Sequence, residues 1–76
     1  MTGYPSKAMV EHLRSVYRKG TRVRLNYMND KQAPPEGTEG TVICVDDIGS
    51  IHVSWDTGSS LAVTYGEDSC SVIGME

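Results

Sequence analysis

The chain has 76 residues and a formal net charge of −3, so we expect one small domain with a thin core and little room for a deep pocket. It has no apolar run of membrane-spanning length and no signal peptide at its first residues, which favours a cytoplasmic protein. Cys44 and Cys70 lie far apart in the sequence, and we expect free, buried thiols rather than a disulfide.

The charges are divided along the chain. Residues 1–31 carry seven cations and two acids, a net charge of +5, whereas residues 32–76 carry eight acids and no cation, a net charge of −8. A division of this kind points to electrostatic partners. The plainer interpretation is that the two parts pack together and satisfy each other's charges.

An amphipathic helix is predicted over residues 6–18. Ser6 is a suitable N-cap, and Gly20, after two cations, is a suitable end. The apolar stripe comprises Met9, Val10, Leu13, Val16 and Tyr17. Because a helix of this length is marginal alone, we expect residues 1–19 to pack on residues 20–76 or on a second chain, which would give a homodimer or a higher oligomer.

Five short strands are predicted in residues 20–76. Alternating apolar and polar residues mark strands over 21–28, 38–45 and 50–55, and a hairpin turn joins the third strand to a fourth that reaches residue 63. Residues 70–73 form the fifth strand and residues 74–76 fray. Gly40 indicates a bend or the close approach of another strand. This spacing predicts a mainly β fold, a small closed five-stranded barrel with one N-terminal helix, in which Trp55 and Tyr27 belong to the core.

Six short motifs follow one another in a familiar order. They are GTRV at 20–23, PPEGTEGTV at 34–42, VDDIG at 45–49, IHV at 51–53, WD at 55–56 and GSSL at 58–61. Over residues 19–73 the chain resembles a short domain-of-unknown-function family of Gram-positive bacteria and their phages. The resemblance implies no particular activity, because none is established for that family. Cys70 stands where the resemblance implies a large aromatic residue.

A looser likeness is to the Mib-Herc2 type of SH3-like domain. In that type a Gly-Thr-Val strand is followed by a V-x-W-D-x-G-S hairpin, which Val53, Trp55, Asp56, Gly58 and Ser59 match. The resemblance implies an SH3-like barrel and peptide binding, although a shared fold does not fix a shared function.

The Asp56-Thr57-Gly58 motif copies the signature of aspartic proteases, in which two such loops share a proton. A single copy would act only in a homodimer, and the 17 residues after Ser59 leave no length for a flap or for buttressing strands. A hairpin turn is the plainer interpretation. The histidines and cysteines lack metal-ligand spacing. We therefore expect no enzyme activity, no metal and no cofactor.

We expect a non-catalytic module that binds a protein or peptide, encoded by a phage or other mobile element and acting, for instance, on a host defence protein. The proline-containing loop at residues 29–37 and the hairpin around Asp56 are the predicted surfaces, and the acidic surface would steer a basic partner. The candidate binding residues are Arg22, Arg24, Tyr27, Pro34, Pro35, Asp47, Trp55, Asp56 and Tyr65.

Two alternatives stay open. Arg22 and Arg24 share the outer face of the first predicted strand, where an oligomer would use them to hold a small nucleotide ligand. With Arg18, Lys19 and Tyr27 they would bind RNA or DNA, although the acidic barrel would repel a phosphate backbone.

Overall fold

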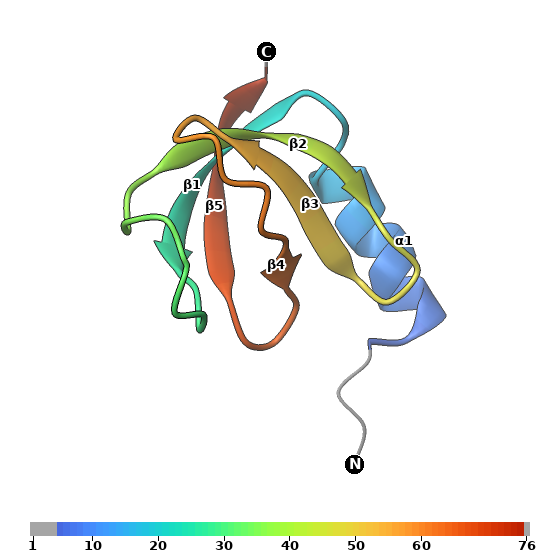
Figure 1. The fold of residues 1–76 in the computed structure, drawn as a ribbon. Coiled ribbons are helices and arrows are strands. Elements are labelled where there is room, and N and C mark those ends of the chain that lie inside the picture. Colours follow the sequence, from blue (N-terminus) through green and yellow to red (C-terminus); the bar gives the residue numbers. More distant parts are fainter. Residues whose placement is uncertain (1–4, 76) are drawn as a thin grey trace.

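The computed structural model describes residues 5–75 and contains one helix and five strands (Figure 1). The elements are α1 (Lys7–Val16), β1 (Thr21–Tyr27), β2 (Glu39–Val45), β3 (Ser50–Trp55), β4 (Val63–Thr64) and β5 (Ser69–Met75). The predicted mainly β fold with an N-terminal helix is confirmed.

The five strands form one antiparallel sheet in the order β4-β3-β2-β1-β5. The sheet curves strongly, and β4 and β5 approach each other at their connecting turn (Figure 1). They form no ladder within the described chain, and β4 is only two residues long. The expectation of a closed barrel is therefore corrected to an open, curved sheet, which is compatible with an SH3-like fold.

The core lies on the concave face of the sheet. Its largest fully buried side chains are Trp55, Leu25, Val23, Val42 and Val53. The Trp55 Nε1 group donates a hydrogen bond to the Leu61 carbonyl oxygen at 2.9 Å, which fastens the segment before β4 to the core. The predicted core position of Trp55 is confirmed.

Gly40 on β2 explains how closely β2 and β3 approach each other. A β-carbon at this position would lie 2.7 Å from Cγ1 of Val53, 2.8 Å from the Ser54 carbonyl oxygen and 2.9 Å from Cε3 of Trp55. The predicted close approach of another strand is confirmed.

Helix α1 packs on the sheet of its own chain. The Ser6 hydroxyl accepts a hydrogen bond from the Met9 amide at 3.1 Å, so the predicted N-cap is confirmed. Val10 and Leu13 are buried, and Nε of Arg14 donates to the Val45 carbonyl oxygen at 3.1 Å. None of the described helical segments is long and apolar enough to cross a membrane.

Tyr27 is 50% exposed, so its expected place in the core is wrong. The cause is a register shift in the β1–β5 ladder between Leu25 and Tyr27, which interrupts the alternation of side chains. Met28 takes the buried position instead.

The C-terminal strand is longer than predicted. Gly74 and Met75 were expected to fray, but they pair with Arg22 and Thr21 of β1. The backbone hydrogen bonds of an antiparallel ladder hold this end of the chain, although its side chains remain exposed.

Candidate functional site

Arg22 and Asp56 form a two-pronged ion pair on the outer surface of the sheet. Nη1 of Arg22 lies 3.0 Å from Oδ1 of Asp56, and Nη2 lies 2.7 Å from Oδ2. Nη1 also donates to the Thr41 hydroxyl at 3.0 Å. Glu39 lies 3.5 Å from Arg22 and 3.8 Å from Arg24. The two arginines that were predicted to face a ligand are thus engaged by the chain's own acids.

The ion pair also bears on the Asp-Thr-Gly motif, for which a hairpin turn was the plainer interpretation. The hydrogen bond from Arg22 lowers the pKa of Asp56, and the same bond raises the pKa of Arg22. A carboxylate held in this way is unsuited to sharing a proton with a second aspartate. Gly58 has a φ of +96° and its amide donates to the Trp55 carbonyl oxygen at 2.9 Å. The motif is a turn in this structure.

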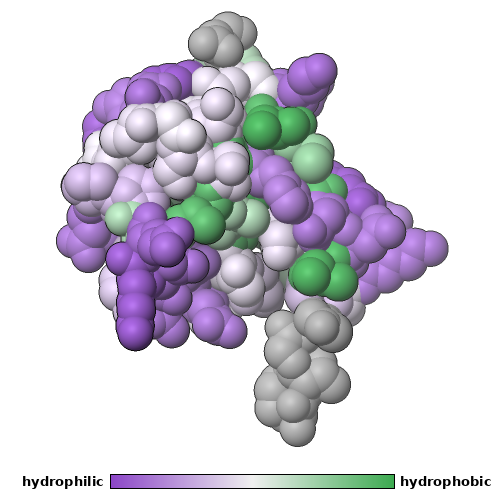
Figure 2. All heavy atoms as spheres, in the orientation of Figure 1, coloured by the Kyte–Doolittle hydropathy of each residue, from purple (hydrophilic) through white to green (hydrophobic). Residues whose placement is uncertain are grey.

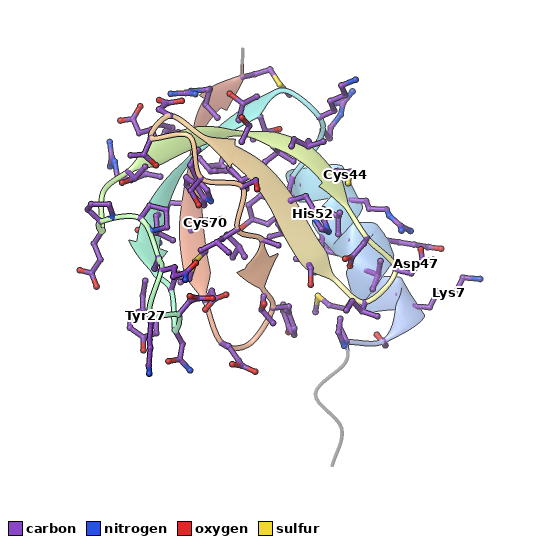
Figure 3. The ribbon with its side chains drawn as sticks, viewed as in Figure 1. Lys7, Tyr27, Cys44, Asp47, His52 and Cys70 are labelled. Atoms are coloured by element: carbon purple, nitrogen blue, oxygen red, sulfur yellow. The ribbon has the colours of Figure 1, made fainter. Side chains whose placement is uncertain are left out.

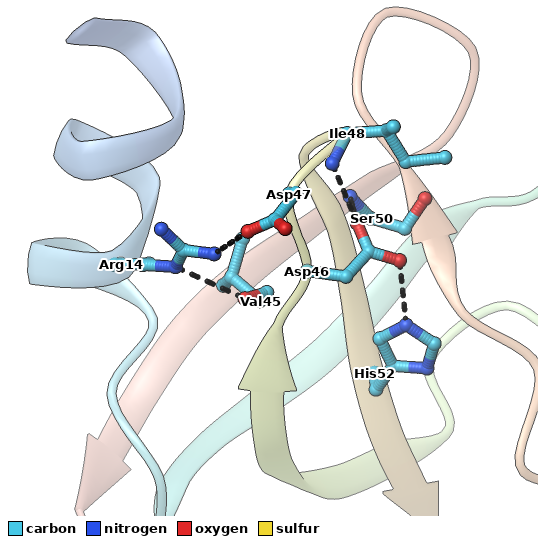
Figure 4. Close-up of polar contacts among 7 residues, drawn as sticks. All are labelled: Arg14, Val45, Asp46, Asp47, Ile48, Ser50 and His52. Atoms are coloured by element: carbon cyan, nitrogen blue, oxygen red, sulfur yellow. Dashed lines mark hydrogen bonds and ion pairs between the residues drawn. The ribbon is translucent and has the colours of Figure 1, made fainter. Parts of the chain in front are cut away.

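The β2–β3 turn is organised by Asp46 (Figure 4). Its carboxylate accepts hydrogen bonds from the backbone amides of Ile48 and Ser50, and lies 2.9 Å from Nε2 of His52. Burial acts to raise the pKa of Asp46, but the hydrogen bonds from His52 and the two amides outweigh it, and the pKa is lowered. The conformation of the turn is therefore fixed by hydrogen bonds to the Asp46 side chain.

Asp47, at the tip of the same turn, joins the turn to the helix. Its carboxylate lies 2.7 Å from Nη2 of Arg14 and is almost fully exposed (Figure 4). Together with the pairs of Arg22 and Arg24, this contact joins the basic part of the chain to its acidic part. The plainer interpretation of the charge division is supported for these three arginines.

Acidification is expected to destabilise the protein below about pH 4. Asp46 and Asp56 both have lowered pKa values in the folded chain. Their contribution to the free energy of unfolding is fully present above the ordinary aspartate pKa of about 3.9 and is lost as the pH falls through the lower folded values. Melting temperatures measured across the acidic range should fall for the natural chain and fall less for Asp46→Asn and Asp56→Asn. A natural-chain melting temperature that does not change with acidity would contradict this assignment.

The two cysteines are free and occupy different surroundings (Figure 3). Cys44 is exposed, so its expected burial is wrong; a register shift in the β2–β3 ladder between Val42 and Cys44 breaks the alternation there. Cys70 lies half-buried in a cleft of about 220 Å³ that Tyr17 and Tyr65 also line. Burial raises the pKa of Cys70 to about 11, although the neighbouring Tyr17 side chain acts to lower it.

The two thiols are expected to differ in their rate of alkylation. Iodoacetamide under mildly alkaline conditions should modify Cys44 well before Cys70, because the Cys70 thiol stays protonated and partly covered. Mass spectrometry of peptides from a time course measures the order, and Cys44→Ser serves as the control that leaves only the slow thiol. Equal rates at the two positions would contradict the burial of Cys70.

The remaining candidate residues do not form one site. Figure 3 shows Tyr27 and Asp47 at opposite ends of the view. Pro34 is buried, whereas Pro35 is exposed and its carbonyl oxygen accepts hydrogen bonds from the Thr38 amide and hydroxyl at 3.0 and 2.6 Å. The proline loop is thus tied to the start of β2.

The surface that the sequence analysis missed is β5. It is the last strand in the sheet order, and its sequence SCSVIGM contains no charged residue and no proline. Val72, Ile73 and Met75 are 47%, 39% and 57% exposed. Apolar side chains also reach the surface among hydrophilic ones on the face of the molecule in Figure 2. A seven-residue uncharged run near the end of an otherwise acidic segment was the available signal.

Comparison with known proteins identifies a family. The model of a domain of unknown function, DUF4314, matches residues 6–73. The chain belongs to this family, and the predicted resemblance to a family of uncharacterised function is confirmed. No curated protein and no solved structure matches the chain.

Proposed function

We propose that this member of the DUF4314 family is a non-catalytic module that binds an extended peptide segment of another protein by adding it to β5 as a sixth strand. The observation that carries the proposal is the outer edge of β5, a strand of seven residues without charge or proline and with three exposed apolar side chains.

Outer strands usually carry features that prevent pairing with other chains, such as charged side chains, proline, short length or a covering segment. β5 has neither charge nor proline, and the structure places no strand on its outer edge within residues 5–75. Main-chain hydrogen bonds to an added strand would give affinity, and alternate side chains would give specificity.

The side chains of β5 support the same conclusion. Val72 lies opposite Val23, and Met75 lies opposite Thr21. Val23 and Thr21 are buried, yet their partners on β5 are about half exposed. The inner face of the sheet is therefore incompletely covered at this edge, and an added strand would cover it. Two register shifts interrupt the β1–β5 ladder, and because such irregularities oppose pairing at an edge, the added strand would pair only over the short stretch between them.

The charges near β5 favour a peptide with cations beside its apolar residues. Glu67 is exposed just before β5. Arg22 and Arg24 of β1 lie opposite β5, but Asp56 and Glu39 already engage them. Complementary charge increases the rate of association and helps to fix the register.

Selection from a displayed peptide library tests the proposal. Selected peptides should bind the natural chain and lose about ten-fold or more in affinity for Val72→Lys, because a buried or edge charge opposes strand pairing. Ile48→Lys is the matched control, since Ile48 is 49% exposed but lies in the β2–β3 turn. Peptides that bind Val72→Lys as well as the natural chain would contradict the proposal. A homodimer that Val72→Lys dissociates would assign the edge to a second copy instead.

The other functions stay predictions. A nucleotide or nucleic-acid phosphate at Arg22 would have to displace the two-pronged carboxylate of Asp56, which counts against both. The origin in a phage or mobile element and the action on a host defence protein stay predictions as well.

A further inference from the structure

A second surface lies between the C-terminal end of α1 and β2. It is a shallow, largely open groove of about 310 Å³, which α1 and the residues after it line with Arg14, Arg18 and Lys19 and which β2 lines with Ile43 and Cys44. β1 lies between β2 and β5 in the sheet, so the groove is separate from the free edge of β5.

The groove has two kinds of cation. Arg14 is held in place by the Val45 carbonyl oxygen and by Asp47. Arg18 and Lys19 are exposed, and no acid among the described residues lies within 4.0 Å of their charged groups. They are therefore available to a carboxylate or phosphate from outside.

The opposite side of the groove is apolar for a local reason. The register shift between Val42 and Cys44 interrupts the β2–β3 ladder at Ile43, and the Ile43 side chain is 48% exposed. Bulges of this kind redirect side chains and are common near functional sites. Ile43 therefore gives the groove an apolar side that faces three cations.

We infer that this groove binds an acidic segment of a partner protein that presents an apolar side chain between its carboxylates. The apolar side chain would cover Ile43 and Cys44, and the carboxylates would form charge-assisted hydrogen bonds with Arg18 and Lys19. A phosphate backbone would satisfy the cations but would leave Ile43 exposed. The inference does not depend on the function proposed for β5.

Titration of the isotope-labelled full chain with the blocked peptide Glu-Glu-Leu-Leu-Glu-Glu, followed by amide chemical shifts, tests the inference. Shifts should centre on residues 17–19 and 43–45. The double variant Arg18→Gln with Lys19→Gln should bind about ten-fold more weakly, and Ile43→Thr should also bind more weakly. Lys31→Gln removes an exposed cation from the loop after β1 and should bind as the natural chain does.

Three results would overturn the inference. The first is undiminished binding by the double variant, and the second is a set of shifts centred away from the groove. The third is that an oligothymidylate binds at the same amides more tightly than the peptide and equally well to Ile43→Thr, which would make the groove a phosphate site. Val72 lies outside the groove, so the effect of Val72→Lys on peptides that bind β5 can be measured independently of peptide binding to the groove.

Discussion

Replacing Trp55 with alanine is expected to remove a large share of the domain's free energy of unfolding. The side chain is 2% exposed and its Nε1 group anchors the Leu61 carbonyl oxygen. Truncating a buried tryptophan costs about 3–5 kcal/mol, whereas a chain of this size has a free energy of unfolding of roughly 4–11 kcal/mol. Circular dichroism during heating and in urea measures the loss.

Tyr65→Ala is the control for this experiment. Tyr65 is an aromatic residue of the same chain that is 41% exposed, so its removal should change the urea midpoint far less. A Trp55→Ala variant that melts cooperatively near the temperature of the natural chain would show that the core is assigned wrongly.

Gly40→Ala is expected to be the second most damaging change. The added methyl group would lie 2.8 Å from the Ser54 carbonyl oxygen, which belongs to the backbone of β3 and cannot move aside as a flexible side chain would. Overpacking of this kind costs about 1–3 kcal/mol. Urea unfolding of the variant measures the difference directly.

Gly74→Ala is the matched control, because Gly74 also lies in a strand but an added β-carbon there meets no atom within 4 Å. It should be neutral or slightly stabilising, since alanine restricts the unfolded chain more than glycine does. Equal urea midpoints for Gly40→Ala and the natural chain would contradict the close packing of β2 on β3.

Local signals predicted much of this fold. The N-cap at Ser6 and the strand carrying Trp55 depend on neighbouring residues, and the structure bears them out. Tyr27 and Cys44 were misplaced because register shifts interrupt strict alternation, and a shift depends on the partner strand.

The candidate site was harder to predict than the fold, for a related reason. The ion pair between Arg22 and Asp56 joins residues 34 positions apart, so the sequence shows two free charges where the structure has one satisfied pair. The exposure of β5 depends on the order of strands in the sheet, which a single sequence does not give. Closure of the barrel was overestimated because only the structure reveals how short β4 is.

The free edge of β5 is best tested by amide hydrogen exchange of the full chain, measured alone and with a peptide selected by display. The account predicts that the β5 amides directed away from β1 exchange quickly in the free chain and become protected when the peptide binds, while amides of β2 and β3 stay unchanged. Protection of those β5 amides in the free monomer, or binding that leaves their exchange unchanged, would contradict it.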